Sequence, residues 1–229
     1  MTIAARPANA VAETQPTFSA RLRAGTREDH EQAEGSAFVS AYLGGRVALE
    51  GYAALQGQLW FVYEAIETSA SLLRGHPVVG PFLDPRLDRL PSLDADLRAL
   101  VGDDWRATVR PNEATRAHAA RIREVAADWP AGFVAHHYIR YLGDLSGGRA
   151  LGAKARTLYG LDDAGARFYR FDEIDSVREF KDHYRRLLDS APWSLTEQDR
   201  IIEEARAGFR LTRAMFDRLG AALGVGEGA

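Results

Sequence analysis

The stretch LGDLSGGRALGAKA, residues 142–155, places four glycines in a segment that otherwise reads as a helix. They are Gly143, Gly147, Gly148 and Gly152. An interior glycine costs a helix about 1 kcal/mol relative to alanine, so the four together cost roughly 4 kcal/mol. Three arrangements would offset that cost: a bound phosphate, a closely packed partner helix, or a bulky ligand lying against bare backbone.

The phosphate alternative fails on spacing. Counted from Gly147, a phosphate-binding loop needs Gly-Lys-Ser/Thr at 152–154, whereas the chain has Gly152-Ala153-Lys154. The sequence contains no second nucleotide motif. Helix packing, which small residues at four-residue spacing permit, stays open beside the bulky ligand.

Composition predicts a globular protein that works without thiol chemistry. The chain has 229 residues, and 46% of them are hydrophobic, which is enough for a large core. A net charge of -3 does not indicate binding to nucleic acid. The absence of cysteine excludes disulfides and thiolate metal sites. No apolar run of about 20 residues is present, so we expect no membrane anchor. Residues 1–16 lack a continuous apolar centre and are expected to be a flexible tail, which favours a cytoplasmic protein.

The dominant hydrophobic period is helical, and alternating β-type runs are missing. Asn112, Asp172 and Thr196 look like residues that begin helices. The expected helices span 18–33, 48–74, 92–101, 112–128, 131–159, 173–189 and 196–221. We therefore predict one all-α domain over 17–221, a multi-helix bundle, with tails at 1–16 and 222–229.

Asp144 favours a ligand over simple packing in the glycine segment. It precedes Gly147 and Gly148 by three and four residues, so its carboxylate overlooks the face that the glycines leave bare. A carboxylate beside an open apolar slot is suited to organising water or protons next to a flat ligand. An aspartate in a helix is more often simply solvated, so this feature does not decide the function alone.

The histidines argue against a metal held by several protein ligands. None of the six has a Glu three residues earlier, and no His-Glu-x-x-His motif occurs. One histidine opposite a bare helix would instead suit iron already held in a porphyrin. His30 is the best candidate because Glu34, one turn later, can orient its ring. A lone histidine is otherwise usually a core or surface residue.

Two motifs resemble one known family. HHYIRYLGDLSGGR (136–149) resembles the distal-helix motif of heme oxygenases, and TREDHEQAEGSAFV (26–39) resembles their proximal-histidine helix. The resemblance extends from about residue 18 to 220 and is greatest to the soluble bacterial enzymes. It implies a single all-α domain with heme held between a proximal and a distal helix.

The resemblance implies roles for residues on both sides of the heme. His30 would be the axial ligand of the heme iron, with Glu34 hydrogen-bonded to its ring. Gly143 and Gly147 would let the distal backbone approach the heme. Asp144 would anchor a water network that delivers protons to dioxygen. Arg140 and Tyr63 match polar positions of that network, although a structural role for Tyr63 is equally consistent with the sequence.

The resemblance also implies how the rest of the heme is held. The propionates would meet cations and one hydroxyl, at Arg23, Lys181, Arg185 and Tyr138. Phe209 and Phe216 match apolar positions over the macrocycle. The spacing between these two residues is also one that any buried helix would show.

Two positions depart from the common family pattern. The family often has lysine at the position of Arg23 and glutamine at that of Arg149. Arg23 keeps the charge but changes the geometry of a propionate contact. These changes bear on which meso carbon is attacked.

The implied reaction uses heme b as both prosthetic group and substrate. With dioxygen and external electrons it would yield biliverdin, expected as the alpha isomer, together with carbon monoxide and ferrous iron. The electrons would come from a ferredoxin or an NAD(P)H-dependent reductase, and we expect a monomer.

Two other hypotheses remain. A heme carrier that does not degrade its ligand would keep His30 and the propionate cations but would not need Asp144. An unrelated helical enzyme, such as a thiamin-degrading bundle, would be expected to carry a cysteine or paired carboxylates, and the chain has no cysteine.

Overall fold

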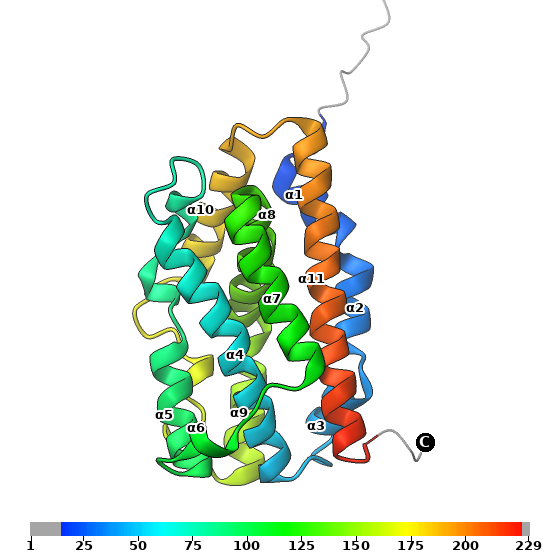
Figure 1. Ribbon diagram of the computed structural model, residues 1–229, viewed down its shortest axis with the longest axis vertical. Coiled ribbons are helices and arrows are strands. Elements are labelled where there is room, and N and C mark those ends of the chain that lie inside the picture. The colour runs from blue at the N-terminus through cyan, green and yellow to red at the C-terminus, as the bar shows by residue number, and fades with distance from the viewer. Residues whose placement is uncertain (1–14, 226–229) are drawn as a thin grey trace, which may run out of the picture.

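The computed structural model describes residues 15–225. The expected tails 1–16 and 222–229 fall largely on residues 1–14 and 226–229, outside the described part, so those domain boundaries stay a prediction. Within 15–225 all regular structure is helical, as the sequence predicts (Figure 1). No helix of this part is long and apolar enough to cross a bilayer.

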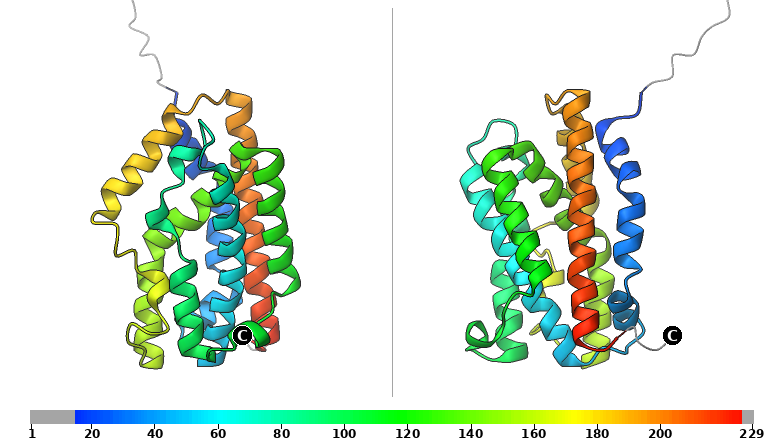
Figure 2. Two further views of the ribbon diagram at one scale, coloured as in Figure 1. Left: turned by 60° about the vertical axis from the view of Figure 1, so that its left-hand side comes forward. Right: turned by 45° about the vertical axis from the view of Figure 1, so that its right-hand side comes forward.

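The helices run along the long axis of the molecule (Figures 1 and 2). Their bounds are α1 Phe18–Gly25, α2 Arg27–Glu34, α3 Ala37–Leu43, α4 Leu49–Leu73, α5 Leu90–Val101, α6 Trp105–Thr108, α7 Glu113–Asp128, α8 Pro130–Gly143, α9 Arg149–Tyr159, α10 Val177–Ser190 and α11 Leu195–Ala222. Short 3₁₀ turns lie at η1 Gly80–Phe82, η2 Pro85–Leu87 and η4 Arg167–Tyr169. The segment η3, Asp144–Gly148, is a π-helical turn between α8 and α9.

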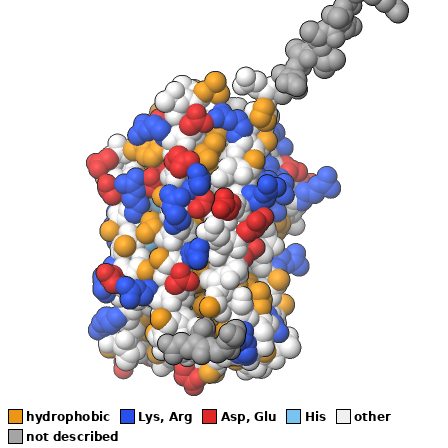
Figure 3. All heavy atoms as spheres, turned by 90° about the vertical axis from the view of Figure 1, so that its right-hand side faces the viewer, with side chains coloured by type: hydrophobic (Ala, Val, Ile, Leu, Met, Phe, Trp, Pro, Cys, Tyr) orange, Lys and Arg blue, Asp and Glu red, His pale blue; other side chains and the backbone are white. Residues whose placement is uncertain are grey.

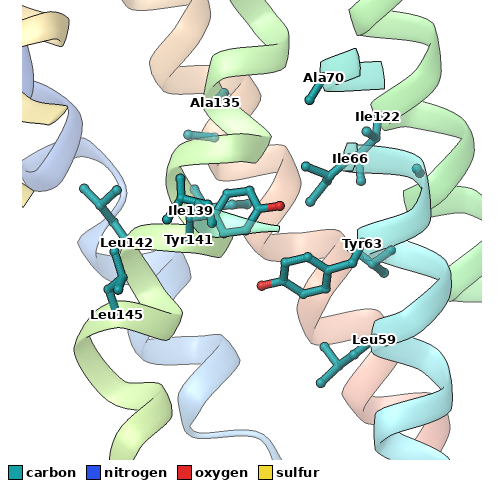
Figure 4. Packing of buried hydrophobic residues seen from close by; sticks show 14 of the residues in the cluster. Leu59, Tyr63, Ile66, Ala70, Ile122, Ala135, Ile139, Tyr141, Leu142 and Leu145 are labelled. Carbon is teal, nitrogen blue, oxygen red and sulfur yellow. The ribbon is translucent and has the colours of Figure 1, made fainter. Parts of the chain in front are cut away.

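The centre of the core lies where α4, α7 and α8 meet. Leu59, Tyr63 and Ile66 project from α4 toward Ile139 and neighbouring residues of α8 (Figure 4). Tyr63 and Ile66 are fully buried. This packing places one face of α8 against the core.

Helix α11 supports both α2 and α8. Asp29 of α2 accepts a hydrogen bond from Arg206 Nε at 2.8 Å and contacts Arg210 at 3.4 Å. On the face shown in Figure 3, Lys and Arg side chains are interspersed with Asp and Glu side chains. α8 also packs along α11, whereas α2 and α8 share no extensive interface within the described residues. Helix α11 therefore lies beside both α2 and α8.

Several predicted helix ends were wrong, and the reason is the identity of the capping residue. The segment predicted at 173–189 begins only at Val177, because Ser176 and not Asp172 accepts the first-turn hydrogen bond, from Glu179 N. Ser194 rather than Thr196 caps α11 in the same way. The cap at Asn112 is confirmed, since its side chain accepts from Thr115 N.

The predicted and observed helices also differ in the interior of two segments and in two short helices. The predicted helix 18–33 is divided at Thr26, whose hydroxyl donates to Leu22 O at 2.8 Å. α3, capped by Ser36, and the single turn α6 were not predicted. The predicted helix 131–159 continues past the glycines, but only by widening into the π-turn η3.

Two of the four glycines in the opening segment lie against Tyr169, and close packing requires one of them. A Cβ at Gly152 would lie 2.7 Å from Tyr169 Cβ and 2.9 Å from its ring, which is too close. A Cβ at Gly148 would lie 3.5 Å from the same ring, which is an ordinary contact distance. Gly152 thus lets the turn η4 lie directly against α9, so close packing explains this glycine.

The substitution Gly152→Ala is expected to destabilise the protein by about 1–3 kcal/mol, because the new methyl group overlaps Tyr169. The matched variant Gly147→Ala meets open space and is expected to leave the free energy of unfolding unchanged or raise it by up to about 1 kcal/mol. Urea denaturation of both variants without added ligand measures the difference. Equal effects in the two variants would contradict the division of the glycines into two groups.

Candidate functional site

The other two glycines leave bare backbone on an open face. A Cβ added at Gly143 or Gly147 would meet no heavy atom within 4 Å. Ser146 lies between them, and all three residues are exposed. The cost of these two glycines is therefore not offset by contacts within the described protein, which indicates that this face accommodates a ligand.

The π-turn η3 lies at the same place. π-turns insert an extra residue into a helix, are rare, and often occur at functional sites. The Ser146 hydroxyl donates to Leu142 O at 2.6 Å across this turn. The sequence does not reveal the turn, because its residues are compatible with ordinary helix apart from the glycines.

Asp144, Arg140 and Tyr63 are brought together behind the open face. Arg140 Nη2 lies 3.3 Å from Asp144 Oδ1 and 3.4 Å from the Tyr63 hydroxyl. Burial raises the pKa of Asp144 well above its usual value and lowers the pKa of Arg140 to about 10. Asp144 Oδ2 and Arg140 Nε have no hydrogen-bond partner within residues 15–225. Asp144 is therefore a buried acid, and both Asp144 and Arg140 can form further hydrogen bonds.

His30 lies on α2 and is only partly buried. Its side chain is 44% exposed, and Nε2 lies 3.4 Å from Glu34 Oε1. The ring of Phe209 on α11 meets the imidazole edge-on, with centroids 5.3 Å apart. Glu34 engages one ring nitrogen, which leaves the other for a ligand.

Cationic side chains gather beside the open face. Lys181 Nζ of α10 donates to Ser146 Oγ at 2.9 Å, which places this cation next to a residue of the open face. Burial raises the pKa of the Tyr138 hydroxyl, and the nearby Arg185 and Arg23 oppose that rise. Burial lowers the pKa of Lys181, as do Arg185 and Arg23. Four predicted residues from α1, α8 and α10 therefore share one region.

The aromatic predictions differ in outcome. Phe209 lies against His30, whereas Phe216 stacks on Phe38 of α3, with centroids 6.0 Å apart. A contact of Phe216 with the macrocycle stays a prediction. Arg149 is exposed on the surface.

Tyr169 and Gln56 also lie in this neighbourhood, and no pattern in the sequence marks either of them. Tyr169 is buried, and its hydroxyl accepts from Gln56 Nε2 at 3.1 Å. Burial raises the pKa of Tyr169. A Cβ added at Gly148 would lie 3.5 Å from Tyr169 Cδ1 and 3.6 Å from Asp144 Cβ, so Gly148 lies beside both residues. Tyr169 sits in a single 3₁₀ turn, where no periodic pattern marks a residue as buried.

Comparison with known proteins gives consistent matches. The family model described as heme oxygenase matches residues 16–218. Heme oxygenase 1 of Synechocystis sp. is 39% identical over 202 residues, which cover 88% of this chain and 84% of that protein. The heme oxygenase of Porphyra purpurea is 40% identical over 203 residues, covering 88% and 86%.

Solved structures match the fold over the same length. The crystal structure of Synechocystis heme oxygenase-1 in complex with heme matches with a TM-score of 0.87 and 38% identity, covering 91% of this chain and 94% of that one. The heme oxygenase of Leptospira interrogans matches with a TM-score of 0.85 and 33% identity, covering 89% and 100%. With these matches added to the two motifs and the open glycine face, the chain belongs to the heme oxygenase family.

Proposed function

We propose that this protein binds heme b between α2 and the open face of α8 and cleaves it oxidatively. The products are biliverdin, carbon monoxide and ferrous iron, and the reaction consumes dioxygen and external electrons. The observation that carries this proposal is the bare backbone at Gly143 and Gly147 directly beside the buried acid Asp144.

The residues present fit a heme. The nitrogen of His30 that does not contact Glu34 would ligate the iron, and Phe209 restricts the ring's rotation. Lys181 and Arg185 would bind the propionates together with Arg23 and the Tyr138 hydroxyl. When bound, heme would supply both the iron that activates dioxygen and the carbon that is oxidised.

The chain's own residues would control protons and space on the distal side. Gly143 and Gly147 allow the backbone to approach the porphyrin face without a side chain between them. Burial raises the pKa of Asp144, and this acid would supply protons to water beside the ligand. Arg140 holds Asp144 and Tyr63 in one orientation.

We further propose the alpha isomer as product, as the family resemblance implies. We propose that another protein supplies the electrons, as the family resemblance implies. A chain without cysteine holds no cysteine-ligated iron–sulfur cluster of its own. A ferredoxin or an NAD(P)H-dependent reductase would fill this role. A monomeric, cytoplasmic, bacterial enzyme remains part of the proposal.

The substitutions Asp144→Ala and Asp144→Asn are expected to preserve heme binding and to lower the biliverdin yield by at least about tenfold, because the proton donor is lost. Hemin titration of the Soret band and bilin yield per heme consumed measure the two effects. Asp103→Asn, at a side chain that is 89% exposed, is the control. Full biliverdin yield from Asp144→Ala would refute the role.

The substitutions Lys181→Ala and Arg185→Ala are each expected to weaken hemin binding about tenfold, because a charge-assisted contact to a propionate is removed. Arg178→Ala on the same helix, at a side chain that is 92% exposed, is the matched control. Dissociation constants from Soret titration and the bilin isomer composition are the measurements. If all three variants bind alike, α10 does not hold the propionates.

The substitution Gly147→Ala is expected to weaken hemin binding although it leaves folding intact, because its methyl group projects into the open face. The same titration detects the change. Unaltered binding and turnover would mean that heme does not approach this position closely.

A further inference from the structure

A hydrogen bond between two buried side chains joins α8 to α10. His137 Nδ1 of α8 lies 2.9 Å from the Tyr184 hydroxyl of α10. The two rings stack, with centroids 5.8 Å apart and planes 9° from parallel. Both residues are buried, and the proposed function uses neither of them. This α8–α10 pair, His137 and Tyr184, therefore requires an explanation of its own.

The hydrogen bond of the α8–α10 pair joins uncharged groups at neutral pH. Burial lowers the pKa of His137 to about 3, and the charge of Asp84 only partly opposes this. Burial, with a smaller contribution from Tyr138, raises the pKa of the Tyr184 hydroxyl well above its usual value. Breaking the bond would leave a polar group of each side chain unpaired in a poorly solvated place, which is costly. The pair is therefore a durable contact between the two helices.

Little else joins α10 to α8. The two helices share no extensive interface within the described part of the chain. In the left view of Figure 2, α10 is inclined to the long helices beside it. Near its end α10 is tied to α1, where Asp189 accepts hydrogen bonds from Ser19 N at 2.8 Å and from Ser19 Oγ at 3.1 Å. The contact of Lys181 with Ser146 is exposed to solvent, so the buried α8–α10 pair is the stronger constraint on this side of α10.

Tyr184 lies among the groups proposed to bind the propionates. It follows Lys181 by three residues and directly precedes Arg185, so all three lie toward one side of α10. Its ring centroid lies 6.4 Å from that of Tyr138, the residue after His137 in α8. A displacement of Tyr184 relative to α8 would therefore move both cations relative to the Tyr138 hydroxyl.

We propose that the α8–α10 pair fixes the position of α10 against α8 and thereby sets how Lys181 and Arg185 are presented to the heme propionates. His137 and Tyr184 are then positioning residues, which act through the two cations. This inference rests on the proposed function, since it assumes that heme is the ligand. It identifies a determinant of heme seating that lies outside the groups proposed to hold the heme.

The test removes the hydrogen bond from either side. Tyr184→Phe deletes only the hydroxyl. His137→Phe keeps a ring but has no nitrogen, whereas His137→Asn places a polar group near the position of Nδ1. Tyr159→Phe is the matched control, because it deletes a hydroxyl that donates to Val47 O at 2.8 Å. Its helix, α9, shares no extensive interface with α10 within the described residues.

The first readout is the position of α10 in heme-free protein. The chain has no cysteine, so Arg178→Cys on α10 and Glu124→Cys on α7 would introduce the only two thiols for spin labels. Both parent side chains are exposed, and α7 packs against α8. Pulsed electron paramagnetic resonance then measures the distribution of distances between the labels. With hemin added, Soret titration gives the dissociation constant, and turnover gives the bilin isomer composition.

Tyr184→Phe and His137→Phe are each expected to shift or broaden the distance distribution, to weaken hemin binding about fivefold and to add a bilin isomer that the parent does not form. His137→Asn is expected to restore the parent values, and Tyr159→Phe to leave them unchanged. Unchanged distances in Tyr184→Phe and His137→Phe would overturn the proposal. Changed distances with unaltered hemin affinity and isomer composition would also overturn it, because α10 would then not act on the propionates.

The two phenylalanine substitutions in the α8–α10 pair remove the same bond independently, so the test stays decisive if one variant does not fold. The distances in heme-free protein require neither heme nor turnover. A parent protein that binds hemin without degrading it would refute the proposed reaction. The α8–α10 pair would then still be supported or overturned by the distances and the hemin affinity.

Discussion

The structure depends on close approach to the backbone of residues 143–152 from two directions. Tyr169 occupies one side, where Gly152 leaves room for its ring and Gly148 lies beside it. The other side, at Gly143 and Gly147, stays open. One helical segment is thereby fixed to the protein on its inner side and free for a ligand on its outer side. A larger residue at Gly152 would displace η4. Larger residues at Gly143 and Gly147 would project into the open space beside α8.

This geometry also explains why a carboxyl group can be buried in the middle of the segment. The segment widens into a π-turn at Asp144, which directs that side chain inward, where Arg140 meets it. In such a poorly solvated place the acid holds its proton more tightly than in water. Burial thus raises the pKa of this acid, and the neighbouring Arg140 guanidinium, 3.3 Å away, restricts where it points.

The side of the proposed heme site that α2 forms is built in a different way. α2 is tied to α11 by Asp29, through contacts with Arg206 and Arg210, and its other side carries the partly exposed His30. Because α8 also packs on α11, this one long helix sets the separation of the two walls. The cations of α10 then lie at the edge of the slot, joined to it by the contact of Lys181 with Ser146.

The sequence by itself determined the helical class, most helix positions, the family resemblance and most residues that meet at the site, because these follow from periodicity and from short motifs. It did not determine the break at Thr26, the π-turn, or the helix starts at Ser176 and Ser194, which depend on local hydrogen bonds. Only the tertiary structure divided the four glycines into two that pack and two that face open space, because that division depends on where Tyr169 lies. For the same reason, the contact of His136 with Glu204 became visible only when α8 and α11 were assembled, since the two residues are 68 positions apart in sequence.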